Sequence, residues 1–196
     1  MSDDDLLKTL FREAFPSVSA ETRAKFSSIL TKEAKDYKWL YAPTLNEHLS
    51  QGDIICSIPA FFFDGVSVKT SKEKGPAILL EHDCDMSIDN GQCRNSHYVF
   101  APLLPYEQIR KKFTDPSAIE NNLITHKIYF PFIPTLNAAY VADLNLIGSL
   151  DAQGLHNSLQ DKTIIRVASL SHNGFFFLLA KLTIHFLRAS AIVDRA

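Results

Sequence analysis

Four residues whose side chains can bind a metal such as Zn²⁺ lie close together near the middle of the chain, in the patterns His82-x-Cys84 and Cys93-x3-His97. Two thiolates and two imidazoles form a ligand set that closes tetrahedral Zn²⁺ sites in structural zinc proteins. A loop hanging from two neighbouring strands would bring the two pairs together. We therefore expect a structural zinc clip formed by His82, Cys84, Cys93 and His97, with a spacing that is not one of the standard ones.

Three carboxylates interleave with the first of these pairs, at Glu81, Asp83 and Asp85. Carboxylate oxygens suit hard cations such as Mg²⁺ or Mn²⁺, so these residues could serve a metal-dependent hydrolase such as a nuclease. If a strand continues through the segment, alternation places the three acids on one face and His82 with Cys84 on the other. A single site that uses all five residues would then require a bulge or a turn.

Cys84 offers a third chemistry, as a nucleophile with His82 or His97 as its general base. The negative charges of Asp83 and Asp85 disfavour a thiolate there, and no sequence typical of an oxyanion hole stands nearby. The alternative for the whole segment is structural. Cys84 would then be a small core residue, His82 a hydrogen-bonded strand end, and the acids a solvated cluster.

An apolar run at 77–80 leads into this segment and predicts a strand over 77–82 that is buried on both faces. Polar residues 85–96, with an Asn90-Gly91 turn signal, predict a loop to an antiparallel neighbour over 98–101. The polar segment 69–75 also predicts a loop. The remaining strands are expected over 38–41, 52–59, 123–130, 139–141, 144–148 and 163–168.

Helices are expected at both ends of the chain, and another over 106–113. Helices over 3–15 and 19–34 would form a hairpin, residues 1–35, beside a single domain of residues 36–196. The last helix opens at Ser171 or Asn173, with an apolar stripe of Phe175, Leu178, Leu179, Leu182 and Phe186. The predicted fold class is α+β, a small bent antiparallel sheet or SH3-like partial barrel with an N-terminal helical hairpin and a C-terminal helix.

Composition narrows the class of protein. The 196 residues include 20 basic and 22 acidic side chains, which gives no global electrostatic case for nucleic-acid binding. Three cysteines suit a reducing cytosol better than a disulfide framework. The acidic N-terminus and the lack of a long apolar run predict a cytoplasmic protein without a membrane span. The runs Phe61-Phe62-Phe63 and Phe175-Phe176-Phe177 favour a protein partner or a homo-oligomer, because three consecutive aromatics cannot all face inward.

The segment 52–82 resembles the start of the MazF/PemK-type toxin barrel. It contains Gly52-Asp53-Ile54-Ile55, a polar loop, and Gly75-Pro76-Ala77 before an apolar strand. That family has Arg before Pro-Ala, and a Ser or Thr at the strand end that helps to cleave RNA. This chain has Gly75 and Glu81-His82 at those places. The resemblance therefore implies the barrel rather than the ribonuclease activity.

A closer resemblance, over residues 52–102 and 163–188, is to uncharacterised bacterial proteins of phage-defence or mobile loci. Their strand-end Cys-Asp and Ala-Pro pairs match Cys84-Asp85 and Ala101-Pro102. Their Arg-x-Ala-x-Leu-Ser segment matches residues 166–171. We expect a non-enzymatic cytosolic binding or regulatory module that acts with a partner protein in a phage-defence or toxin–antitoxin-like locus. The alternative is a metal-dependent hydrolase or nuclease that uses the Glu81–Asp85 cluster.

Overall fold

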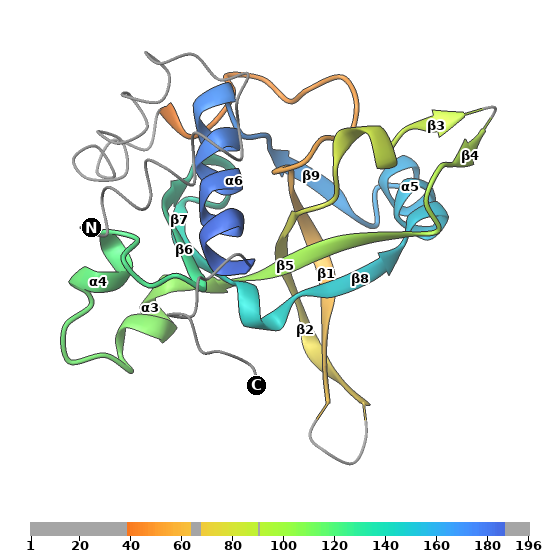
Figure 1. Cartoon of the computed structure of the whole chain (residues 1–196). Helices are drawn as coiled ribbons and strands as arrows, with labels where there is room; N and C mark the ends of the chain where they lie inside the picture. Colours follow the sequence, from red (N-terminus) through yellow and green to blue (C-terminus); the bar gives the residue numbers. More distant parts are fainter. Residues whose placement is uncertain (1–38, 64–67, 90, 187–196) are drawn as a thin grey trace, which may run out of the picture.

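Strand β5 (His97–Pro105) is the central strand of a seven-stranded sheet (Figure 1). The computed structural model describes residues 39–63, 68–89 and 91–186, with side chains for all of these except 60–73. The sheet has the order β6-β7-β5-β2-β1-β9, with β8 also on β5, and all its pairs are antiparallel. The α+β prediction is confirmed, and the sheet does not close into a barrel because β6 and β9 are not paired.

The other strands surround β5 on both edges. They are β1 (Ile54–Phe63), β2 (Val68–Leu79), β6 (Lys127–Ile133), β7 (Ala138–Asp143), β8 (Gly148–Asp151) and β9 (Ile165–Ala168). Strands β7 and β8 lie end to end along one edge of β5, with the 3₁₀ turn η4 (Leu144–Leu146) between them. Strand β2 occupies the opposite edge.

The strand predicted to be buried on both faces is confirmed for Ala77, Ile78 and Leu79, which are all 0% exposed. Ile78 belongs to one core cluster, whereas Ala77 and Leu79 belong to another. The predicted antiparallel neighbour is confirmed as β5. The predicted loop over 69–75 is wrong, because that segment lies in β2, which pairs with β1. Main-chain hydrogen bonding to β1 determines the structure of segment 69–75, although its polar composition favours a loop.

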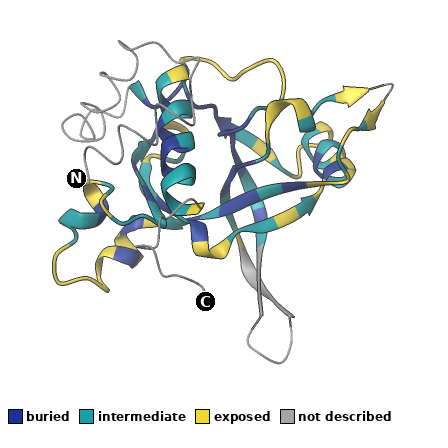
Figure 2. Ribbon diagram, viewed as in Figure 1, coloured by how far each residue is buried: buried dark blue, intermediate teal, exposed yellow. Residues whose placement is uncertain are grey.

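Helices cover both faces of the sheet. Helix α6 (His172–Phe186) contributes to the larger cluster, and α5 (Ala152–Gln160) to the second, on the other face. Helices α3 (Tyr106–Arg110) and α4 (Ser117–Glu120) pack in a third cluster with Val141 of β7. Figure 2 shows the buried residues along the middle of the sheet and on the inner side of α6. The predicted hairpin of residues 1–35 lies outside the described residues.

Helix α6 begins as predicted, because the Ser171 hydroxyl accepts the Gly174 N–H at 3.1 Å. Its predicted stripe is largely wrong. The buried residues are Gly174, Phe177, Leu178, Ala180 and Lys181. A Cβ atom on Gly174 would overlap the carbonyl oxygen of Leu40, so this glycine lets the helix approach the chain closely and sets which face turns inward. No helix among residues 39–63, 68–89 and 91–186 is long and apolar enough to span a membrane.

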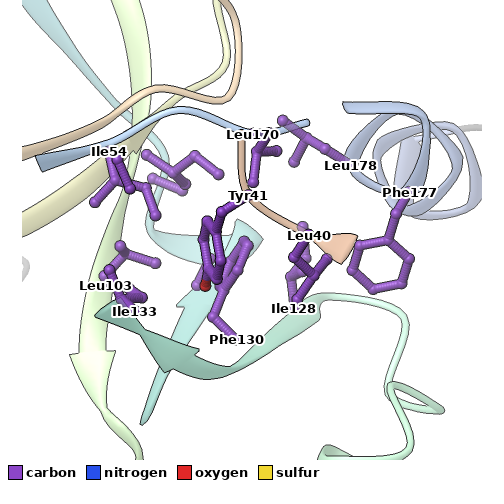
Figure 3. Packing of buried hydrophobic residues seen from close by; sticks show 14 of the residues in the cluster. Leu40, Tyr41, Ile54, Leu103, Ile128, Phe130, Ile133, Leu170, Phe177 and Leu178 are labelled. Carbon is purple, nitrogen blue, oxygen red and sulfur yellow. The ribbon is translucent and has the colours of Figure 1, made fainter. Parts of the chain in front are cut away.

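Tyr41 lies within the larger core cluster, and Figure 3 shows it among Leu40, Phe130 and Ile133. It is 8% exposed, and an isolated bridge pairs it with Leu170. Burial raises the pKa of its hydroxyl. The hydroxyl oxygen has no hydrogen-bond partner among the described residues.

Replacement of Tyr41 by phenylalanine is expected to raise the free energy of unfolding by about 1 kcal/mol, because an unpaired buried hydroxyl costs about 1–3 kcal/mol. Urea denaturation of both proteins measures the difference. Tyr140→Phe, at a partly buried tyrosine packed against the same cluster, is the control. A loss of more than 1 kcal/mol in Tyr41→Phe would show that the hydroxyl has a stabilising partner.

Candidate functional site

The segment with the predicted ligands leaves the sheet as a turn. Strand β2 ends at Leu79, and η2 (Asp83–Asp85) is a single 3₁₀ turn. The main-chain N–H groups of Asp85 and Met86 both donate to the His82 carbonyl, and Met86 is 3% exposed in the second core cluster. The predicted continuation of the strand to 82 is therefore wrong. The alternation that separated the acids from His82 and Cys84 does not apply.

Two of the three predicted catalytic acids accept main-chain hydrogen bonds. Asp83 Oδ1 accepts the Gln51 N–H at 2.5 Å, and Glu81 Oε2 accepts the Val99 N–H at 3.2 Å. These bonds connect the turn to the segment before β1 and to β5. The half-buried Asp85 makes no side-chain hydrogen bond within the described part of the chain. The acids therefore have unequal structural roles in this arrangement.

Asp83→Ala is expected to lower the free energy of unfolding by about 1 kcal/mol, because the Gln51 N–H loses its acceptor. Asp85→Ala is the matched control two residues away, with an expected change within about 0.5 kcal/mol. Chemical denaturation of the two variants measures both values. Equal losses would contradict the assigned role of Asp83.

The four predicted zinc ligands have separate neighbours. His82 Nδ1 accepts the Cys84 N–H at 3.2 Å, while the Cys84 carbonyl accepts the Ser87 hydroxyl at 3.0 Å. His97 Nδ1 lies 3.0 Å from the Ser96 hydroxyl. Cys93 belongs to a separate two-stranded sheet of β3 (Ile88–Asp89) and β4 (Gln92–Cys93), in which it pairs with Ile88.

No group of three or more His, Cys, Asp and Glu side chains is placed to hold a metal ion in the described part of the chain. The zinc clip of His82, Cys84, Cys93 and His97 therefore stays a prediction from the sequence. Metal analysis of protein purified without added metal is its direct test. The same holds for a metal site of Glu81, Asp83 and Asp85.

A cluster of chemically active side chains instead lies where β4, β5 and α5 meet (Figure 1). The Tyr98 hydroxyl lies 3.1 Å from His156 Nε2, and the two rings meet edge to face with centroids 5.7 Å apart. The Cys93 thiol donates to Gln153 Oε1 at 3.7 Å. Cys93, Tyr98, Gln153 and His156 form what we call the thiol cluster.

Two members of the thiol cluster, Tyr98 and His156, are uncharged near neutral pH. Burial lowers the pKa of His156, so its imidazole is neutral. Burial, assisted by Cys93 and by the charge of Glu81, raises the pKa of Tyr98. Tyr98 is 0% exposed, whereas Cys93 and His156 are half-buried. The Tyr98 hydroxyl and His156 Nε2 can therefore share a proton without a permanent buried charge.

A second group of polar side chains connects Asp53, in the 52–55 motif, to Arg166, in the 166–171 motif. Asp53 Oδ2 accepts Arg166 Nη1 at 3.0 Å and the Ser50 N–H at 2.9 Å. Arg166 also donates to the carbonyls of His48 and Asn46. Burial raises the pKa of Asp53, while Ser169, Ser50 and Arg166 act in the opposite direction. The side chain of Arg166 is 17% exposed and that of Asp53 is 1% exposed, so the two form a buried ion pair. This ion pair connects the 46–50 loop to β9.

Sequence inspection missed Tyr98, Gln153 and His156 because no helix was expected over 152–160. One local signal was present, since Asp151 is a favourable N-cap and its Oδ1 accepts the Gly154 N–H at 2.6 Å. Comparison with family models, with curated proteins and with solved structures gives no match for this chain. The two resemblances therefore rest on the short motifs quoted above.

Proposed function

We propose that the protein is a non-enzymatic binding or regulatory module that engages a partner protein through the outer part of the β1–β2 hairpin. The observation that carries this proposal is the length of that hairpin. Strand β9 pairs with β1 only over Ile54–Cys56, and β5 pairs with β2 only over Ala77–Leu79. Beyond these positions β1 and β2 pair with each other as far as Phe63 and Val68.

We call residues 58–63 and 68–75 the arm. In Figure 1 the arm extends away from the rest of the sheet, with no other described element along it. A two-stranded ribbon is marginally stable in water by itself. Contacts with a partner would stabilise it, so a projecting ribbon is a reasonable docking element.

The sequence of the arm distinguishes its two edges. Strand β2 carries Lys69, Lys72 and Lys74, and its pairing with β1 contains an irregularity between Pro59 and Phe61. Lysines and bulges are the usual means by which sheet edges are kept unpaired. The end of β1, Ala60–Phe63, has neither lysine nor proline. A partner strand therefore fits the β1 edge better than the β2 edge.

An exposed apolar side chain continues this surface at the base of the arm. Ile165 of β9 pairs with Cys56 of β1 and is 47% exposed. A partner that adds a strand along β1 would approach Ile165, and covering it would contribute apolar burial. This supports a protein partner rather than a small ligand.

The proposal includes two finer points from the sequence. One is an SH3-like partial barrel, which is supported where Thr135 Oγ1, just after β6, donates to the Val167 carbonyl of β9 at 2.6 Å. The N-terminal helical hairpin that accompanies it rests on the sequence pattern alone. The other is a cytoplasmic role in a phage-defence or toxin–antitoxin-like locus, which rests on the resemblance. The hydrolase alternative has less support, because Glu81 and Asp83 already accept main-chain N–H groups.

The test is affinity purification of the tagged full chain from the organism that encodes it, beside an arm-shortened variant. In that variant Asn-Gly replaces residues 60–73 and joins Pro59 to Lys74, which are paired in register. We expect a partner that copurifies with the natural chain and is lost from the variant, while circular dichroism shows that both are folded. Equal recovery by both chains, or recovery by neither, would contradict the proposal.

Nuclease assays distinguish the hydrolase alternative from the binding proposal. RNA and DNA are incubated with the protein and Mg²⁺, Mn²⁺ or Zn²⁺, in parallel with an Asp83→Ala/Asp85→Ala variant. We expect no cleavage from either protein. Cleavage that this variant abolishes would replace the binding proposal with the hydrolase.

A further inference from the structure

The two strands of the arm differ in regularity. Between the pair of Pro59 with Lys74 and the pair of Phe61 with Thr70, β1 advances by two residues and β2 by four. The extra residues therefore form a bulge on β2, and one of them is a lysine. Strand β1 pairs without a further shift from Phe61 to its end. Bulges and lysines both keep a sheet edge from pairing, so β1 presents the regular edge of the arm.

The base of the arm separates β1 from its other neighbour. Strand β9 pairs with β1 only as far as Cys56, and the next residue, Ser57, has a φ of 72°. Strand β1 carries one extra residue here, between the pairs that Ile55 and Ile58 make with β2. A bulge of this kind bends the strand and increases its twist. Beyond it, the outer edge of β1 has no neighbour among the described strands.

Charge distinguishes the two edges as contacts between copies of the chain. No residue of β1 is charged, whereas β2 carries three lysines, Lys69, Lys72 and Lys74. A symmetric contact between two β2 strands would place lysines near lysines, and one between two β1 strands brings no like charges together. An uncharged apolar edge is also a template for pairing with another chain. A second copy therefore fits the β1 edge when no other partner covers it.

We infer that the chain forms a symmetric dimer in which the β1 edges of two arms pair antiparallel. Pro59 has no main-chain N–H to donate, so the pairing covers residues 60–63. The register that pairs all of them places Phe61 opposite Phe62 of the second copy, and Ala60 opposite its Phe63. The outer strands of the combined ribbon are then the two bulged, lysine-bearing β2 strands. The contact is therefore closed, and the assembly stops at two chains.

The dimer depends on the proposed function in one respect, because both require that the β1 edge can add a strand. It gives that edge a means of regulation. The second copy and the partner protein occupy the same edge, so each excludes the other and the partner must displace the second copy. Because the paired segment is short, the contact is a small one, and we expect a dissociation constant on the order of 10 µM.

The experiment is sedimentation velocity of the full chain over about 1–200 µM, beside two charge variants. These are Phe61→Lys/Phe62→Lys and Phe61→Glu/Phe62→Glu, and in each the register places like charges opposite one another. We expect each variant alone to dimerise at least about tenfold more weakly than the natural chain. An equimolar mixture places opposite charges together and should restore the dimer. Thr70→Lys/Ser71→Lys adds the same charge to β2, and this matched control should dimerise as the natural chain does.

The outcomes separate the dimer from the proposed function. Circular dichroism first shows that every variant is folded. A natural chain that is monomeric at every concentration would overturn the dimer, and the copurification test would still decide the proposed function. A dimer that both charge variants retain, or a mixture that stays monomeric, would also overturn it. Loss of the copurified partner beside an intact dimer would contradict the proposed function alone.

Discussion

Replacement of Asp53 by alanine is expected to lower the free energy of unfolding by about 3 kcal/mol, since removal of one member of a buried ion pair costs about 3–5 kcal/mol. The Asp53 side chain is 1% exposed and accepts both Arg166 and the Ser50 N–H. The variant would leave the Arg166 guanidinium half-buried without a counter-charge. Urea or guanidinium denaturation gives the magnitude.

A double-mutant cycle separates the ion pair from other effects of the substitution. Arg166→Met alone should also cost about 3 kcal/mol, because Asp53 would then be buried without its counter-ion. Since both single variants break the same interaction, the double variant should lose clearly less than the sum of the two. Additive losses would show that Asp53 and Arg166 stabilise the fold independently.

Lys181 is expected to make stability rise with pH in the alkaline range. It is 2% exposed on α6, where its Nζ donates to the carbonyls of Asn122 at 2.9 Å and Ile124 at 2.8 Å. Burial lowers its pKa to about 8. It forms no ion pair with any described residue. Burial therefore disfavours the charged amine of Lys181, and the two main-chain oxygens offset only part of this desolvation cost.

The direction in which the free energy of unfolding changes with pH follows from the number of protons that each state binds. An unfolded lysine keeps its proton to a pH of about 10.4, so between pH 8 and pH 10 the unfolded chain binds more protons and the native state gains stability. The free energy of unfolding of the natural chain, minus that of Lys181→Met, should rise by about 2 kcal/mol from pH 7 to pH 10. Lys112→Met, at an exposed lysine, is the matched control for the loss of one positive charge. A flat profile for Lys181→Met would show that the amine is well solvated.

Much of the central sheet was predictable from local pattern. The continuous apolar run Ala77–Leu79 indicated burial on both faces, and the polar segment 85–96 indicated a connection to an antiparallel neighbour, which is β5. These features depend on residues that are near one another in the sequence. The arm was missed because the polar composition of 69–75 is typical of a loop, while the long-range pairing with β1 decides its structure.

The candidate sites were less predictable, because they depend on contacts between distant segments. Tyr98 and His156 are 58 positions apart, and Asp53 and Arg166 are 113 apart. The cluster that looked richest in the sequence, Glu81–Asp85, folds into a turn in which Glu81, His82 and Asp83 accept main-chain N–H groups. Side-chain type indicated polar roles at these positions, but only the turn geometry distinguishes a hydrogen-bond acceptor from a metal ligand.

We propose that the arm is the surface through which this module binds its partner. The most direct measurement is the dissociation constant of the copurified partner for the natural chain and for the arm-shortened variant, by isothermal titration calorimetry. We expect affinity at least about 100-fold weaker for the variant, which corresponds to about 2.7 kcal/mol. Equal affinity for two equally folded chains would contradict it.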